Sequence, residues 1–291
     1  MTFFAGNDGD DDAARNAVRE LRELLLNAAH GLQAEAAGKD RIELLEAVLG
    51  TDVCSRLGIY ALPADFVLSV VIPVFNEAAT IERVIQRVRE TKLPLEIVVV
   101  DDGSSDGTRE VLERLSMEQD VNVVFHDQNQ GKGAALKTGF MEATGHVIVV
   151  QDADMEYDPQ DLRLLLQPIL ENAADVVYGS RFSGPDGAVS PLWHLAANKL
   201  ISILFNLFHG LRFTDVETCY KLFRRELIHE IAPGLRENRF GIELELTAKL
   251  AKNRDIRFYE RPIRYARRSY AEGKKIGWRD GLWALWCILR Y

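Results

Sequence analysis

The sequence predicts an α/β fold, in which a mostly parallel sheet carries helices on both of its faces. Four short apolar runs, rich in β-branched residues, alternate with helical patterns between residues 66 and 150. Such runs are typical of strands that are buried on both faces of a parallel sheet. A polar motif follows each run directly. Because ligands bind outside the carboxyl ends of parallel strands, the same pattern predicts a ligand site at that edge.

Each element of this fold follows from a local pattern. Strands are predicted at 66–72, 95–100, 121–125, 147–150 and 174–178, and helices at 79–91, 109–115 and 134–143. In the first helix, apolar residues recur at helical spacing, namely Ile81, Val84, Ile85 and Val88. The regular alternation of strand and helix favours parallel strands joined by crossover helices.

The N-terminal part has a different character and carries no chemical motif. Residues 1–12 contain several aspartates among glycines and are expected to be disordered. Residues 13–62 contain two amphipathic patterns, which predict a helical extension that serves packing or oligomerisation. Residues 63–182 and 183–291 are then expected to form the two halves of the α/β domain.

The composition is that of a soluble globular protein, with 47% hydrophobic and 27% charged residues. The net charge of −9 argues against nucleic acid as a partner. Three widely separated cysteines form neither a metal motif nor a disulfide framework, which indicates a reducing, cytoplasmic setting. The N-terminus lacks the pattern of a signal peptide, and no run of about eighteen apolar residues predicts a membrane-spanning helix.

The acidic motif after the fourth strand is the first candidate site. Asp152, Asp154 and Glu156 stand at every second position, and Pro159 ends any strand. In an extended segment alternate residues share one face, so the three carboxylates are expected to point into the same space. Mg²⁺ or Mn²⁺ would relieve their mutual repulsion, because both ions favour oxygen ligands. The alternative is a solvated acidic turn.

Two further strand ends point to a nucleotide. The carboxylates of Asp101 and Asp102 suit hydrogen bonds from a base or a ribose, and the segment that follows them also suits a helix N-cap. Gly131, Lys132 and Gly133 supply a flexible backbone and a cation beside a helix N-terminus, which suits a diphosphate. Neither a Rossmann fingerprint nor a Walker loop is present. A nucleoside diphosphate that is held through a metal accounts for all three motifs.

Four segments occur in a fixed order along this region: Val70-Val-Ile-Pro-Val-Phe-Asn-Glu77, Val99-Val-Asp-Asp-Gly-Ser104, Asn129-Gln-Gly-Lys-Gly133 and Gln151-Asp-Ala-Asp154. Together they resemble family 2 glycosyltransferases of the GT-A fold and, within them, the dolichyl- or polyprenyl-phosphate mannosyltransferases. The resemblance implies a nucleotide-sugar donor, GDP-mannose or UDP-glucose. It assigns donor binding to Pro73, Phe75, Glu77, Asp101, Asp102, Lys132, Asp152 and Ala153.

The resemblance also assigns roles to the acidic motif. Asp152, Asp154 and Glu156 would hold the metal, with Glu156 standing where that branch often has a glutamine. The metal would neutralise the leaving diphosphate while the acceptor phosphate attacks the anomeric carbon with inversion. Because a phosphate monoester is ionised at neutral pH, this reaction requires no general base.

The acceptor side is expected in the second half of the chain. Arg181 matches an arginine that the family uses on phosphate, the alternative being a surface ion pair. Asp215 matches a segment near the family's reaction centre, with loop fixing as the alternative; both residues, with Asp154, are predicted to be catalytic. The basic segment 267–275 resembles a loop over the acceptor phosphate, to which Arg267, Arg268 and Lys274 would bind.

Two apolar segments raise the question of a membrane. Residues 198–212 form a nearly apolar helix that is too short to span a bilayer. A helix from Trp278 carries apolar residues at helical spacing and follows a basic stretch, which suits an anionic membrane surface. The prediction is a peripheral protein at the cytoplasmic face of the membrane. The alternative for both helices is packing on the protein core.

These observations predict a metal-dependent inverting hexosyltransferase, with mannose as the favoured sugar and a polyprenyl (dolichyl or undecaprenyl) phosphate as acceptor. Residues 63–182 would bind the nucleotide sugar and residues 183–291 the acceptor. One alternative is a family 2 enzyme with a saccharide or other hydroxyl acceptor, which would need a general base. A nucleotidyltransferase would need a glycine- and arginine-rich loop after the first strand, which is missing. A non-catalytic nucleotide-sugar-binding module is opposed by the complete acidic and basic motifs.

Overall fold

The computed structural model describes residues 19–21, 23–24, 41–183, 192–266 and 278–291. By its internal contacts the chain divides into two units, Met1–Ala64 and Asp65–Tyr291. In the first unit, helices α2 (Arg41–Leu49) and α3 (Thr51–Arg56) enclose a small core of Leu45, Cys54 and Ile59. The tail predicted to be disordered, residues 1–12, lies outside the described residues.

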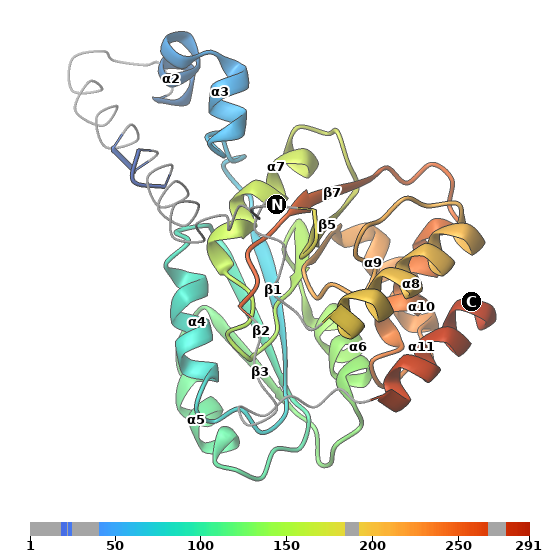
Figure 1. The fold of residues 1–291 in the computed structure, drawn as a ribbon. Helices are drawn as coiled ribbons and strands as arrows, with labels where there is room; N and C mark the ends of the chain where they lie inside the picture. The colour runs from blue at the N-terminus through green and yellow to red at the C-terminus, as the bar shows by residue number, and fades with distance from the viewer. Residues whose placement is uncertain (1–18, 22, 25–40, 184–191, 267–277) are drawn as a thin grey trace, which may run out of the picture. The chain divides into compact units, whose positions relative to one another are not determined.

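The second unit is built on one seven-stranded sheet with the order β3-β2-β1-β4-β6-β5-β7 (Figure 1). Strand β6 runs antiparallel to β4 and β5, and the other neighbouring strands are parallel. The mostly parallel sheet confirms the predicted fold class. The strands are β1 Leu68–Val74, β2 Leu95–Asp101, β3 Val121–Phe125, β4 Val147–Val150, β5 Val176–Ser180, β6 Lys221–Arg224 and β7 Phe258–Pro262.

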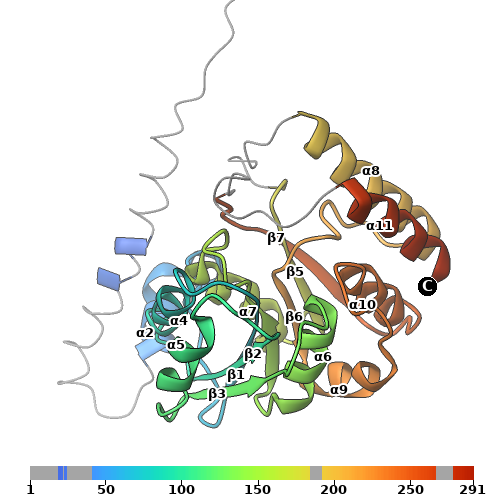
Figure 2. The ribbon, with the colours of Figure 1, turned by 90° about the horizontal axis from the view of Figure 1, so that it is seen from below.

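Helices lie on both faces of this sheet (Figure 2). The chain moves outward from β1 to β3 and then returns across the sheet to β4. Because parallel crossovers are right-handed, this reversal puts α6 on the face opposite α4 and α5. The helices are α4 Ile81–Arg89, α5 Thr108–Leu115, α6 Lys132–Glu142, α7 Leu162–Leu170, α8 Leu192–His209, α9 Arg225–Ile231, α10 Ile242–Ala251 and α11 Trp278–Arg290.

Strand β1 ends two residues beyond the predicted boundary and includes Pro73, which the sequence assigned to a loop. Its pairing with β4 ends at Val71 opposite Val150, whereas its pairing with β2 continues to Val74. At Pro73 one edge of the strand is therefore unpaired, so the missing N–H of proline leaves no gap in the ladder.

Strands β6 and β7 are not predicted from the sequence. Strand β6 is only four residues long, and it buries the charged Lys221 completely. Strand β7 lies at the edge of the sheet and contains two charged residues, Glu260 and Arg261. Charged residues are common on edge strands, because they prevent further strand pairing.

Candidate active site

The loops that follow β1, β2 and β4 are bonded to one another at one edge of the sheet. The Asn76 N–H donates to the Ser104 hydroxyl at 2.9 Å, which joins the first loop to the second. The Thr80 hydroxyl donates to the Ala153 carbonyl at 2.7 Å, which joins the first loop to the third. The structure therefore brings together three of the segments to which the sequence assigned donor binding.

The acidic segment after β4 is a turn and not an extended strand. Strand β4 ends at Val150, and Met155 lies in the left-handed region with a φ of 63°. An L-residue adopts this conformation mainly in turns. The expectation that Asp152, Asp154 and Glu156 share the face of an extended segment is therefore wrong.

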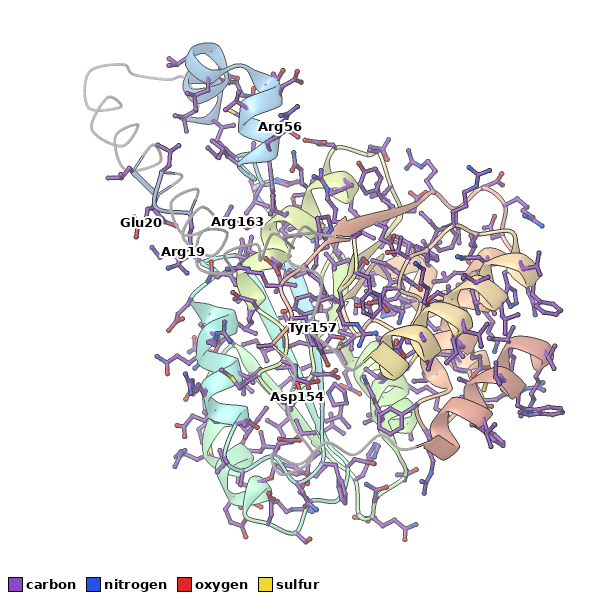
Figure 3. The ribbon with its side chains drawn as sticks, in the orientation of Figure 1. Arg19, Glu20, Arg56, Asp154, Tyr157 and Arg163 are labelled. Atoms are coloured by element: carbon purple, nitrogen blue, oxygen red, sulfur yellow. The ribbon has the colours of Figure 1, made fainter. Side chains whose placement is uncertain are left out.

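Each carboxylate of this turn has a different environment. Asp152 Oδ1 lies 2.9 Å from the Lys132 ammonium group, and Asp154 Oδ1 accepts from the Glu156 N–H at 3.1 Å. Glu156 Oε2 accepts from the Tyr265 hydroxyl at 2.9 Å. Within the described residues, no group of three His, Cys, Asp or Glu side chains is arranged to hold a metal ion. Figure 3 labels Asp154 in this turn and Tyr157 just after it.

Lys132 is the first residue of α6 and belongs to a buried chain of alternating charges. Its ammonium group contacts Asp152 and, at 3.2 Å, Glu243 Oε1 on α10. The other Glu243 oxygen accepts from Lys221, which also donates to the Thr218 carbonyl. Burial alone would lower the pKa of Lys132, but Asp152 and Glu243 raise it well above its ordinary value. Lys132 is therefore a fixed cation at this edge of the sheet.

Asp102 anchors the loop before α6 from one side. Its Oδ1 lies 2.8 Å from His126 Nδ1 and accepts from the Gln130 N–H at 3.0 Å, and its Oδ2 accepts from the Gly131 N–H at 2.7 Å. With its side chain buried, Asp102 holds the loop in place. Its assignment to donor binding stays a prediction.

The segment Glu237–Asn238 anchors the same loop from the other side. The Asn238 carbonyl accepts from the Gly133 N–H at 2.8 Å and from the Ala134 N–H at 3.2 Å. A β-carbon at Gly131 would collide with the Asn238 carbonyl, and one at Gly133 with the Glu237 carbonyl. The two glycines therefore admit a neighbouring backbone. The N–H groups of Gly133 and Ala134 are therefore already bonded, and the Lys132 side chain between them and the acidic turn contacts Asp152 and Glu243.

Asp101 differs from Asp102 in having an oxygen to spare. It is fully buried at the end of β2, where its Oδ1 accepts from the Ser104 N–H at 3.2 Å. Its Oδ2 is buried too, and no described residue provides it with a hydrogen-bond partner. Unsatisfied buried acceptors are rare and costly. Among the described residues, Asp101 therefore has a buried oxygen that is left to accept a hydrogen bond.

The other predicted donor residues line the loop after β1. Phe75 is half-buried, and the Glu77 N–H donates to the Thr108 hydroxyl at 2.9 Å. The Glu77 carboxylate accepts from the Thr80 hydroxyl, also at 2.9 Å. The loop after β1 therefore contacts Thr108 at the start of α5 through Glu77 and the acidic turn through Thr80.

Arg181 and Asp215 form a buried, bidentate ion pair. Arg181 Nε donates to Asp215 Oδ2 at 2.7 Å, and its terminal nitrogen donates to Oδ1 at 2.8 Å. The Arg181 N–H donates to the same carboxylate at 3.1 Å. Asp215 is fully buried, and its carboxylate orients the guanidinium group, while its predicted catalytic role stays a prediction.

Tyr265 joins Arg181 to the acidic turn. Its hydroxyl is bonded to Glu156, while the Arg181 guanidinium lies 5.3 Å from the centre of its ring. Tyr157 packs on the same ring with centroids 5.2 Å apart. Tyr265 was not identified from the sequence, because it lies on a loop far along the chain. The structure thus brings Glu156 of the acidic turn and Arg181 to one place.

The remaining predicted acceptor residues, Arg267, Arg268 and Lys274, lie outside the described residues. The last cation before them, Arg264, is paired with Asp158 at 2.9 Å and with Asp161 at 2.9 Å. Arg264 therefore fixes the start of this segment to the loop that follows the acidic turn.

Glu217 is a further acid in this region that the sequence did not single out. Burial raises its pKa to about 7, against opposing contributions from Arg181 and Lys221. The nearby charge of Asp215 raises it further. Glu217 therefore changes its charge near neutral pH, next to the Arg181–Asp215 pair.

We expect Glu217 to make stability fall as the pH rises. Between its ordinary pKa of 4.5 and its folded pKa of about 7, the folded protein keeps a proton that the unfolded chain has lost. The free energy of unfolding should decline through this window and level off above it. In urea titrations at several pH values, Glu217→Gln should make the decline smaller, and the exposed control Glu226→Gln should leave it unchanged. A decline unchanged in Glu217→Gln would contradict the assignment.

Helices α8 and α11 lie side by side (Figure 2) and expose apolar side chains. Their inner sides pack with α10 in a core that includes Phe205, Leu244 and Ile288. The outward residues are at least 46% exposed, namely Leu200, Ile203, Leu207 and Phe208 on α8 and Leu282, Trp283, Trp286 and Leu289 on α11. We call these eight residues the apolar face. Contiguous exposed apolar residues mark an interaction surface.

No described helix is both long enough and apolar enough to cross a membrane. The apolar face therefore belongs to two helices that pack on the domain with their opposite sides, as the alternative interpretation of the sequence required. The structure leaves their outward sides uncovered by any described residue of the chain.

A family model described as glycosyl transferase family 2 matches residues 69–232. The UDP-N-acetylglucosamine–dolichyl-phosphate N-acetylglucosaminyltransferase of Methanococcus voltae is 28% identical over 73% of this chain and 92% of its own length. The dolichol-phosphate mannosyltransferase of Pyrococcus furiosus is 32% identical over 72% of this chain. This chain spans only 59% of that relative and 34% of glycosyltransferase AglD of Haloferax volcanii.

Solved structures share the fold. The glucosyl-3-phosphoglycerate synthase of Mycobacterium tuberculosis aligns with a TM-score of 0.57 at 20% identity, over 88% of this chain and 85% of that one. The mannosyl-3-phosphoglycerate synthase of Rubrobacter xylanophilus aligns with a TM-score of 0.56 at 20% identity, over 87% and 77% of the two chains. These similarities confirm the predicted GT-A fold.

Proposed function

Because the chain belongs to glycosyl transferase family 2, we propose that it transfers a hexose from a nucleoside diphosphate sugar to a polyprenyl phosphate. The observation that carries the proposal is the link from Glu156 through Tyr265 to Arg181, which puts donor-side acids beside a buried guanidinium group. Relatives named for dolichyl and polyprenyl phosphates support the acceptor class. Mannose remains the favoured sugar, with glucose as its rival.

On the donor side, three side chains divide the nucleotide between them. The unpaired oxygen of Asp101 accepts an N–H group of the base, which would satisfy a buried acceptor. The Lys132 ammonium group faces the diphosphate, and its two acidic neighbours keep it charged although burial alone would lower its pKa. Phe75 lies on the loop after β1, where it is half-buried, and offers its ring to the nucleotide.

The acids of the turn suit a divalent cation by their chemistry. Asp154 and Glu156 are partly exposed carboxylates two residues apart, and oxygen atoms are the ligands that Mg²⁺ and Mn²⁺ prefer. Asp152 is the least available of the three acids as a metal ligand, since one of its oxygens is paired with Lys132. We propose that Asp154 and Glu156 would supply carboxylate ligands to the ion, while Asp152 stays paired with Lys132 beside them. When bound, the ion neutralises the leaving diphosphate.

On the acceptor side, Arg181 binds the phosphate of the lipid. Asp215 occupies two of the guanidinium N–H groups, which leaves the remaining ones for a phosphate oxygen. Arg267, Arg268 and Lys274 are proposed to add further positive charge. Since the phosphate is already ionised at neutral pH, it attacks the anomeric carbon without a general base, and the configuration inverts.

The proposal is tested by incubating the full chain with radiolabelled GDP-mannose or UDP-glucose, Mn²⁺ and polyprenyl phosphate in mixed micelles. We expect label from one donor to pass into the organic phase. The same reaction with a polyprenol that lacks phosphate should give no labelled lipid. Label that passes only to water-soluble sugars, or to nothing, would contradict a polyprenyl-phosphate transferase.

A hydroxyl acceptor is the second candidate, and Glu217 is the observation that favours it. A carboxyl group with a pKa of about 7 is matched to general-base catalysis near neutral pH. Transfer to a hydroxyl needs such a base, whereas transfer to an ionised phosphate does not. Glu217→Gln would therefore abolish transfer to a hydroxyl acceptor and retain transfer to a phosphate.

We propose further that the apolar face contacts the bilayer that contains the acceptor, as a peripheral attachment. The three cysteines are buried free thiols, which supports the reducing, cytoplasmic side. Leu207→Ser combined with Leu289→Ser should lower partitioning onto vesicles of phosphatidylcholine and phosphatidylglycerol by about tenfold or more, because each leucine contributes about 1.5–3 kcal/mol when buried. The measurement is co-sedimentation with the vesicles.

The control for this experiment is Met117→Ser, which removes an equally exposed apolar side chain from the opposite part of the domain, after α5. It should leave partitioning unchanged. Equal partitioning of the double variant and the native protein would contradict the bilayer contact.

A further inference from the structure

We infer that Glu237 is a positioning residue for Lys132, through which helix α11 sets the place of the donor-side ammonium group. The inference rests on the proposed function, in which Lys132 faces the diphosphate. It assigns a role in donor binding to a helix that carries no donor motif. Three sets of contacts support it.

The first set joins the backbone of Glu237 and Asn238 to the start of α6. The Asn238 carbonyl accepts from the N–H groups of Gly133 and Ala134, at 2.8 and 3.2 Å. The Lys137 ammonium group, one turn further along α6, donates to the Asn238 side chain at 2.5 Å. Because a β-carbon at residue 131 or 133 would collide with this backbone, the segment fits closely around Lys132. A shift of the segment must therefore shift Lys132.

The second set joins the Glu237 side chain to the C-terminal helix. Its Oε2 accepts from Trp283 Nε1 at 2.8 Å, and its Oε1 accepts from the Tyr291 hydroxyl at 2.8 Å. Arg290 lies 3.4 Å from the same oxygen. Glu237 is only 5% exposed, and a buried carboxylate without partners is costly. If α11 moved away, the buried Glu237 carboxylate would lose its hydrogen-bond partners, and the fold would be destabilised.

The third set fixes the backbone of this segment on α10. Glu245, a fully buried residue, accepts from the Glu237 N–H at 2.7 Å and from the Arg236 N–H at 2.8 Å. Contacts with α10, α11 and α6 therefore fix the position of the segment. Contacts on α11 are transmitted to the loop, because the backbone cannot absorb them by moving on its own.

Trp283→Phe tests the inference, because it removes the indole N–H that bonds Glu237 and keeps an aromatic ring at this half-exposed position. A hydrogen bond to a charged group contributes about 1.5–3 kcal/mol. If half of this free energy is lost from the binding of the nucleotide by Lys132, the Kd for GDP or UDP with Mn²⁺ should rise roughly three- to tenfold. Calorimetry on the full chain measures the Kd. The KM for the nucleotide sugar should rise equally, with kcat within about twofold of the native value.

Two variants of Glu237 separate positioning from a general loss of stability. Glu237→Ala should weaken nucleotide binding at least as much as Trp283→Phe. Glu237→Gln should restore it, because its amide oxygen accepts from Trp283 and its amide group can donate to the Tyr291 hydroxyl. The control Tyr259→Phe removes a donor from a half-exposed aromatic residue on β7 and should leave the Kd unchanged.

The outcomes distinguish the two levels of the proposal. If native protein binds nucleotide and Trp283→Phe binds it equally well, Glu237 does not position Lys132. A fall in kcat at constant KM in Trp283→Phe would also overturn the inference, as would equal weakening by Tyr259→Phe. If the native protein binds neither GDP nor UDP in the presence of Mn²⁺, the proposed function fails and the inference falls with it.

Discussion

Asp154→Asn should lower transfer about a thousandfold and leave the protein folded. The substitution keeps the size of the side chain but removes the charge that would hold the divalent ion and balance the leaving diphosphate. Losing that stabilisation raises the barrier by several kcal/mol, and about 4 kcal/mol corresponds to a thousandfold in rate. The measurement is the initial rate of lipid labelling at saturating donor.

A substitution of Glu156, the next acid of the turn, should reduce activity less than Asp154→Asn does. Glu156→Gln should keep most of the activity, because an amide oxygen still ligates a hard cation and can still accept from the Tyr265 hydroxyl. EDTA should abolish transfer by the native protein, and added Mn²⁺ or Mg²⁺ should restore it. Asp127→Asn, at an exposed acid four residues before Gly131, is the matched control. Full activity of Asp154→Asn, or of the native protein in EDTA, would refute the metal assignment.

The fold could be predicted because its central strands are apolar on both faces. Strands β1, β2 and β4 are continuous β-branched runs whose burial follows directly from their composition. Strand β6 was not predicted, because the charged Lys221 is typical of an exposed segment. In the structure, Glu243 and the Thr218 carbonyl accept hydrogen bonds from the buried Lys221 ammonium group. Its partners are separated from it in the sequence, so the local pattern contains no sign of them.

The site was predictable in its position but not in its side-chain directions. Parallel topology alone sends the loops after β1, β2 and β4 to one edge. Asp101 keeps an unpaired oxygen because His126 and the Gly131 N–H bond to Asp102 and not to Asp101. Asn238, which occupies the N-terminal N–H groups of α6, comes from more than a hundred residues away. Such contacts follow from packing and not from spacing in the sequence.

Asp215→Asn should destabilise the fold by about 3–5 kcal/mol, because it leaves the Arg181 guanidinium inside the protein without its countercharge. Burial by itself lowers the pKa of Arg181, and the Asp215 charge raises it well above its ordinary value. Urea denaturation measures the loss. The control is Glu82→Gln, which breaks an ion pair with Arg114 of similar length, 2.8 Å, whose side chains are about 60% exposed. It should cost less than about 1 kcal/mol.

A double variant separates the structural role of this pair from its role in transfer. Arg181→Met with Asp215→Asn leaves no net charge buried, so it should recover much of the stability lost in Asp215→Asn alone. Transfer should remain lost, because the guanidinium group proposed to hold the acceptor phosphate is gone. If the double variant transfers sugar at the native rate, Arg181 has no part in acceptor binding. Since Asp215 touches Arg181 through three hydrogen bonds, its influence on the reaction is then also excluded, and the acceptor phosphate must bind elsewhere.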